Sequence, residues 1–108
     1  MFILIYVTNP SEKVANDIAD HLIKDKMVAC ANVFPIKSMY WWQGNIERDD
    51  EYVTILKTRP ELWEKVKNEI EQIHPYDTPC IMKWEVAANA AYEDWIKKST
   101  IGVNINPL

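Results

Sequence analysis

The side chain best suited to chemistry in this 108-residue sequence is His74, which precedes the rigid segment Pro75–Pro79. A neutral imidazole is the commonest protein ligand for borderline divalent metals such as copper. The alternative interpretation is that His74 caps a helix by donating to a terminal carbonyl, where the helix dipole favours its charge. The sequence makes His74 the first candidate metal ligand and leaves this structural interpretation open.

Two cysteines and an acidic run are the remaining candidate ligands. Cys30 and Cys80 show no Cys-x-x-Cys or Cys/His spacing, so we interpret both as reduced, largely buried thiols. Cys30 is a weaker candidate for metal binding than His74. The acidic residues between positions 47 and 51 offer hard oxygen ligands, but we favour a solvated sheet edge whose charges discourage aggregation.

Composition excludes several classes of protein. A net charge of −4 argues against sequence-independent binding to nucleic acid, which needs a positive surface. No apolar run approaches the roughly 20 residues of a membrane span, and no signal peptide is evident, so we expect a cytoplasmic protein. Two glycines leave no glycine-rich phosphate loop, and neither His21 nor His74 has an evident catalytic partner. We therefore expect a non-enzyme that forms one domain over residues 1–108.

Predicted strands and helices must position these residues. The run Phe2–Thr8 is continuously apolar and β-branched, which predicts a buried strand. Asn9 then suits the cap of a helix that has Pro10 in its first position. Thr58–Glu61 has the pattern of a second capping box, and its helix should end at His74 because the residue before a proline avoids helical geometry.

The longest predicted element is a β-hairpin between Met27 and Lys57, with its turn at Gln43–Gly44. Trp41 and Trp42 stand side by side near the turn, and successive strand residues point to opposite faces. The two indoles therefore cannot share one core, and a two-stranded hairpin cannot cover both. We predict that another copy of the chain covers them, which makes the protein an obligate oligomer.

The remaining elements complete a βαββαβ order. Cys80–Val86 is the last predicted strand, a short helix follows at Tyr92–Lys98, and residues 101–108 alternate like a strand that could extend a sheet edge. This order predicts an α+β fold, a ferredoxin-like βαββαβ sandwich with an extended central hairpin and a short C-terminal helix. Pro35, inside the first hairpin strand, indicates a bulge, a bend or an edge position.

Several motifs are spread over nearly the whole chain: Val28–Asn32, Tyr40–Gly44, Glu51, Ile55–Thr58, His74–Pro79, Tyr92 and Trp95–Ile96. Together they resemble those of the CutA divalent-cation-tolerance family. The blocks YWWQG and HPYDTP are specific when they occur together. The resemblance implies a ferredoxin-like fold, a tightly interlocked homotrimer and a cytoplasmic role in tolerance of copper and other divalent metals.

The sites implied by this resemblance are only partly present. The copper ligands proposed for the family are a cysteine in the first strand and the histidines before Pro-Tyr. This chain has Val7 and Ile73 at two of those positions, so only His74 carries over. A site for Cu(II) or another divalent metal would be weak or completed by another subunit, and no cofactor is obligatory.

An alternative is a trimer of the PII signalling type, which resembles the CutA trimer and holds small effectors in clefts between subunits. Its link to metals would be indirect. A trimer with a purely structural role also stays open. The residues expected in such a cleft or in the subunit interface are Trp41, Trp42, Tyr52, Lys57, Tyr76 and Trp84.

Overall fold

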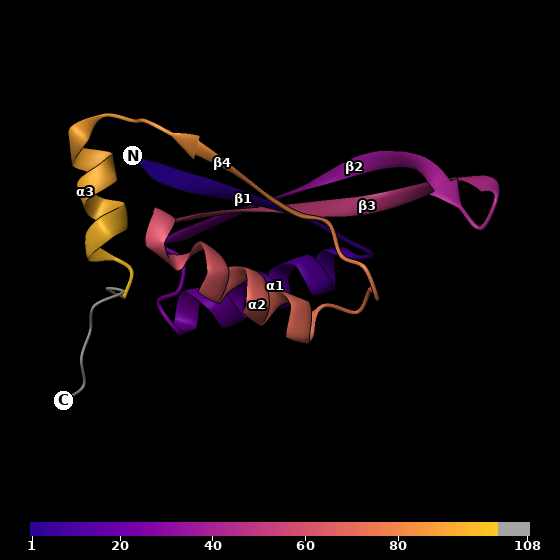
Figure 1. Ribbon diagram of the computed structural model, residues 1–108, viewed down its shortest axis with the longest axis horizontal. Coiled ribbons are helices and arrows are strands. Elements are labelled where there is room, and N and C mark those ends of the chain that lie inside the picture. The colour runs from indigo at the N-terminus through magenta and orange to yellow at the C-terminus, as the bar shows by residue number, and fades with distance from the viewer. Residues whose placement is uncertain (102–108) are drawn as a thin grey trace.

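The computed structural model describes residues 1–101, which form a four-stranded antiparallel sheet and three α-helices (Figure 1). The elements are β1 Phe2–Asn9, α1 Glu12–Lys24, β2 Cys30–Trp42, β3 Asn45–Thr58, the 3-10 helix η1 Pro60–Leu62, α2 Trp63–Ile73, β4 Ile81–Val86 and α3 Ala90–Lys98. The sheet order is β2-β3-β1-β4. The predicted α+β class and order of elements are confirmed, whereas the predicted tail strand falls mainly outside the described residues.

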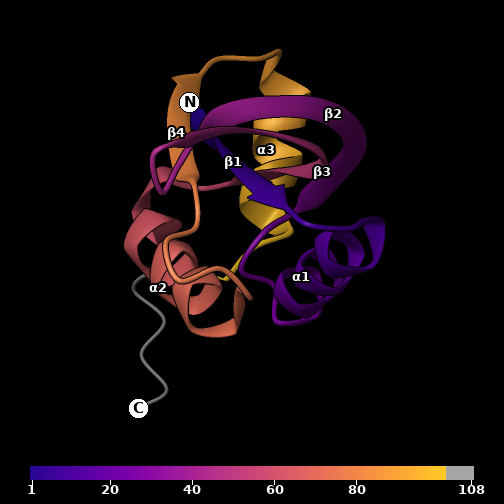
Figure 2. The same ribbon diagram turned by 90° about the vertical axis from the view of Figure 1, so that its right-hand side faces the viewer.

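The core lies between the sheet and a layer formed by α1 and α2, which Figure 2 shows side by side below the strands. Alternate residues of β1 point to this layer, and Ile3, Ile5 and Val7 are fully buried there. The apolar stripe of α1 meets them through Ile18 and Leu22. Burying a side chain of this size stabilises the fold by about 1.5–3 kcal/mol.

The starts of both long helices differ from the prediction. Ser11, rather than Asn9, caps α1, because its Oγ accepts from Val14 N–H at 3.2 Å. Asn9 is instead the fully buried last residue of β1. Thr58 ends β3 and its hydroxyl donates to Met27 O at 2.6 Å, so α2 is entered through η1 without a side-chain cap. Strand pairing extends through both predicted cap residues and uses their polar side chains inside the fold.

The opposite face of the sheet has no helix layer over most of its length within the described residues. Helix α3 packs against one end of this face, where Tyr92 contacts the Phe2 ring and accepts a hydrogen bond from Lys57 (Figure 1). The apolar side of β4 points to this open face, where Met82 is 42% and Trp84 is 46% exposed. Lys83 points the other way and lies over the Trp63 ring at 5.3 Å. The faces predicted for β4 are therefore right, but its apolar face is uncovered.

Strands β2 and β3 continue past the sheet as a long two-stranded hairpin (Figure 1). Their pairing runs without a gap from Cys30 opposite Lys57 to the turn. Pro35 lies opposite Tyr52 on β2, so the predicted edge position is confirmed, and the continuous pairing excludes a bulge there. The hairpin therefore presents two exposed sides to its surroundings.

The hairpin turn and its tryptophans lie where the sequence predicts them. Gln43 and Gly44 both adopt positive φ angles, 49° and 82°, as a tight turn with the twist of antiparallel strands requires. Trp41 is 73% and Trp42 56% exposed, on opposite sides of the hairpin. A single copy of the chain leaves both indoles largely uncovered.

Candidate functional site

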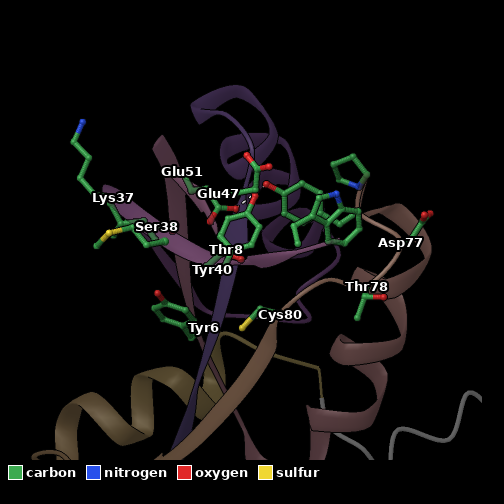
Figure 3. Close-up of a pocket in the computed structure, with 15 residues that line it drawn as sticks. Tyr6, Thr8, Lys37, Ser38, Tyr40, Glu47, Glu51, Asp77, Thr78 and Cys80 are labelled. Atoms are coloured by element: carbon green, nitrogen blue, oxygen red, sulfur yellow. Dashed lines mark hydrogen bonds between the residues drawn. The ribbon is translucent and has the colours of Figure 1, made fainter. Parts of the chain in front are cut away.

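A groove of about 1140 Å³ lies between the hairpin and the loop that joins α2 to β4 (Figure 3). The hairpin contributes Tyr40 and Glu51 from the side that faces away from the helices. The loop contributes Tyr76, while Tyr6 comes from β1 and Cys80 from the residue before β4. The curl of the hairpin over β1 therefore brings segments distant in sequence to one concave surface.

His74 lies beside this groove and uses both ring nitrogens inside the fold. Its Nε2 is 2.9 Å from Thr8 O and 3.2 Å from Asn9 Oδ1, and its Nδ1 accepts from Tyr76 N–H at 3.1 Å. Because both partners of Nε2 are acceptors, we assign the proton of a neutral imidazole to Nε2. Burial lowers the pKa of His74 and favours this neutral ring, although the Thr8 carbonyl opposes the shift.

These contacts bear on both interpretations of His74. The helix end predicted there is confirmed, since α2 ends at Ile73 and His74 is its C-cap. The ring donates to β1 rather than to a terminal carbonyl of α2, so that part of the structural interpretation is wrong. Metal binding through His74 stays a prediction, and it requires loss of the hydrogen bond between Nδ1 and Tyr76 N–H.

Asn9 is at the centre of the hydrogen-bond network that includes His74. Its amide is fully buried, and Nδ2 donates to Tyr52 O at 3.0 Å and to Thr54 Oγ1 at 3.2 Å. Its Oδ1 accepts from His74, so one side chain links β1, β3 and the loop after α2. The sequence signal for this role was a single amide at the end of an apolar strand, which the prediction assigned to a helix cap instead.

Glu51 is the buried carboxylate of the groove, at 8% exposure. Its Oε2 accepts from the Tyr76 hydroxyl at 2.7 Å, and burial together with this carboxylate raises the pKa of Tyr76. Asp49 accepts from the Tyr40 hydroxyl, which raises the pKa of Tyr40 to about 12. The solvated-edge interpretation is thus wrong for Glu51, although Asp49 and Asp50 are exposed. Neutral phenols around a carboxylate suit a polar or cationic ligand.

The residues predicted to share a cleft are divided among several surfaces. Trp42 and Tyr76 line the groove, while Trp41 points to the other side of the hairpin. Lys57 and Trp84 both flank Leu4 on the open face, outside the groove. Tyr52 points toward the helix layer, opposite Asn9 in the register of β1 and β3. Within residues 1–101 of one chain, the groove contains only Trp42 and Tyr76 of the predicted set.

The two thiols do not form a common site. Cys30 begins edge strand β2 and Cys80 precedes β4 at the opposite edge, so three strand spacings, about 14 Å, separate them across the sheet, and they are also offset along the strands. Both thiols are free, but they are half-buried rather than largely buried as predicted. Burial raises the pKa of Cys80, which keeps it a poor thiolate ligand at neutral pH.

His21 Nε2 lies 3.3 Å from Glu69 Oε2, a contact between helices that the sequence did not reveal. Within residues 1–101, however, neither histidine hydrogen-bonds a serine, threonine or cysteine side chain. A nucleophile activated by histidine is therefore not assembled in the described part of the chain. None of the helices there has the length and apolar content needed to cross a membrane.

Acidification is expected to weaken the fold through His74. Burial lowers its pKa in the folded chain below the ordinary 6.5, so the unfolded chain takes up a proton at higher pH. The free energy of unfolding keeps this contribution above pH 6.5 and loses it as the pH falls below that value. Denaturant unfolding between about pH 7.5 and about pH 5 should show this loss, and His74→Gln should flatten it. An equally steep profile in the variant would contradict the assignment.

Comparison with known proteins agrees with this fold. The sequence model of the family described as CutA1 divalent ion tolerance protein matches residues 3–99. The divalent-cation tolerance protein CutA of Pyrococcus horikoshii is 40% identical over 99 residues, which cover 91% of this chain and 97% of that protein. The corresponding protein of Archaeoglobus fulgidus is 42% identical over 96 residues, covering 88% and 94%.

Solved structures of this family have the same fold as this chain. The crystal structure of CutA1 from Pyrococcus horikoshii superposes with a TM-score of 0.90 at 40% identity, covering 93% of this chain and 99% of that one. The structure described as the periplasmic divalent cation tolerance protein CutA from Archaeoglobus fulgidus gives 0.89 at 41% identity, covering 92% and 98%. The predicted resemblance is confirmed: this chain belongs to the CutA1 divalent ion tolerance protein family.

Proposed function

We propose that this chain acts in tolerance of divalent metal ions as a homotrimer, joined through the open face of the sheet and the hairpin. The observation that supports the assembly is the amount of apolar surface left uncovered on these two regions. The large exposed side chains there are Phe34, Met39, Trp41, Trp42, Ile46, Met82 and Trp84. Soluble monomers rarely leave so much apolar surface in water, and oligomer interfaces use such aromatic anchors.

The shape of the hairpin favours a closed ring of copies. It projects past the sheet (Figure 1) and carries Trp41 on one side and Trp42 on the other, so it offers apolar surface in two directions. One copy can place its hairpin over the open face of the next, and a head-to-tail contact of this kind forms a ring when the rotation between copies closes. Three copies follow from the trimer that the family resemblance implies.

A second candidate function is a small-ligand signalling or scaffold trimer of the PII type, with only an indirect link to metals. The groove supports it, because a concave space of about 1140 Å³ contains the buried Glu51 carboxylate and its partner Tyr76. Pockets with a few convergent polar groups are the usual sites for small ligands. Under both proposals the chain is cytoplasmic and is not an enzyme, in line with its free Cys30 and Cys80.

A calorimetric Cu(II) titration of the metal-free protein separates the two candidates. Direct action on divalent ions predicts weak, saturable binding at a fixed ratio to the chain. An absence of saturable binding would favour the indirect link and the groove. His74→Gln, titrated beside the wild type, tests the ligand predicted from sequence. Loss of binding would give His74 a metal role, and unchanged binding would leave it only the hydrogen bonds seen here.

A further inference from the structure

A second group of potential ligands lies on the helix layer, away from the groove and the open face. His21 and Asp25 come from the end of α1, and Glu69 comes from α2. His21 Nε2 is 3.3 Å from Glu69 Oε2 and 3.9 Å from Asp25 Oδ2. One ligand atom from each residue lies within 4.8 Å of the other two. The fold has therefore gathered an imidazole and two carboxylates from two helices.

The local backbone explains why these side chains converge. Asp25 is the C-cap of α1, and its N–H bonds to His21 O at 3.3 Å, so the helical turn between them is kept. Residues four apart in a helix lie on the same face, which places the imidazole and the carboxylate together. Glu69 is held opposite them because its neighbour Ile70 is buried in the core between α2 and the sheet.

The spacing is close to that of a metal site. A tetrahedral zinc ion with ligands at about 2.1 Å holds its ligand atoms about 3.4 Å apart. The 3.3 Å between His21 and Glu69 already meets this spacing, and the 3.9 Å to Asp25 needs only a small rotation of an exposed side chain. Imidazole nitrogen with carboxylate oxygen suits borderline ions such as Zn²⁺ rather than Mg²⁺ or Ca²⁺, which prefer oxygen alone.

The charges around His21, Asp25 and Glu69 also favour binding of a cation. Asp25 places a negative charge at the C-terminal end of α1, where the helix dipole is itself negative and a cation is favoured. Within residues 1–101, no lysine or arginine nitrogen comes within 4.0 Å of the Asp25 or Glu69 carboxylate, although Lys24 and Lys26 flank Asp25 in sequence. One imidazole, which carries at most a single positive charge, cannot compensate two carboxylates, so a bound divalent ion would balance the charge.

We propose that His21, Asp25 and Glu69 bind a borderline divalent metal ion, with water completing its coordination. All three side chains are reached by solvent, with side-chain exposures of 41%, 55% and 24%. The site differs from the one predicted around His74, and all its ligands belong to a single chain. It therefore stands whether or not the copies form the proposed trimer, and it lies on the layer of α1 and α2, away from the open face of the sheet (Figure 2).

Zinc titration of the chelator-treated full chain tests this site. We expect one Zn²⁺ per chain, with an affinity about tenfold or more weaker in His21→Gln and in Glu69→Gln. Asp20→Asn on α1 and Glu71→Gln on α2 are matched controls, because each removes one exposed carboxylate outside the cluster. Both controls should bind zinc like the wild type. Zinc should also raise the melting temperature of the wild type and the controls, but not of the two cluster variants.

Two results would overturn the proposal. One is the absence of saturable zinc binding at this ratio in the wild type, which would leave His21 and Glu69 as an ordinary contact between helices. The other is binding by His21→Gln and Glu69→Gln that equals binding by the controls. Light scattering on the same samples reports the oligomeric state, so failure of the zinc site is distinguished from failure of the proposed assembly.

Discussion

Replacing Trp41 and Trp42 with alanine is expected to dissociate the assembly, each single variant weakening it and the double variant yielding single copies. The two indoles are 73% and 56% exposed in one chain, so their removal costs the isolated fold little. At an interface, a buried tryptophan anchor typically contributes at least about 2 kcal/mol. A symmetric ring would lose this contribution at every contact. Sedimentation velocity and thermal melting, compared at equal protein concentration, measure the two effects.

Ile23→Ala is the matched control for the tryptophan variants. Ile23 is also apolar and 40% exposed, but it lies on α1, in the helix layer, on the side of the sheet opposite the open face. Its replacement should leave the sedimenting mass unchanged. A double tryptophan variant with the mass and melting temperature of the wild type would contradict the role assigned to the hairpin.

The second large effect is expected from Asn9→Ala, which should lower the free energy of unfolding by about 3 kcal/mol. The buried amide donates to Tyr52 O and Thr54 Oγ1 and accepts from His74 Nε2–H. Alanine would leave these groups without their partner and would open a small cavity beside them. Chemical denaturation at one fixed protein concentration measures the change, because unfolding of an oligomer depends on concentration.

Asn16→Ala provides the control for this experiment. Asn16 is exposed on α1, and its replacement should change the free energy of unfolding by no more than about 0.5 kcal/mol. If Asn9→Ala were as stable as this control, the network around His74 would not stabilise the fold as argued. Replacing Asn9 would then change the free energy of unfolding no more than replacing an exposed surface residue does.

Much of the fold was predictable because it depends on periodicity. The buried run after Phe2 gives β1, and the hairpin turn needs the backbone freedom of Gly44. The helix caps were less predictable, since the same polar residue can cap a helix or end a strand. Asn9 and Thr58 both took the second role, and only their partners across the sheet decide this. Ser11 was the correct cap of α1 and stood two residues further on.

The sites were harder to predict because their residues are distant in sequence. His74 bonds to Asn9 across 65 positions, and His21 contacts Glu69 across 48. No spacing rule links such pairs. Glu51 shows the same limit: it belongs to an acidic run, yet it alone among its neighbours is buried by Tyr76 and the curl of the hairpin. The sequence identified the loop that begins at His74 as part of the site. It did not show that both ring nitrogens of His74 already form hydrogen bonds within the fold.

The mass of the wild-type chain in solution is the decisive test of the proposed trimer. Light scattering coupled to size exclusion, at micromolar protein concentration and without added metal, gives the mass in solution. We predict three times the 12.7 kDa of one chain, because the open face and the hairpin need neighbouring copies to cover them. A single-chain mass across the accessible concentrations would contradict it and would leave the tryptophans exposed for another reason.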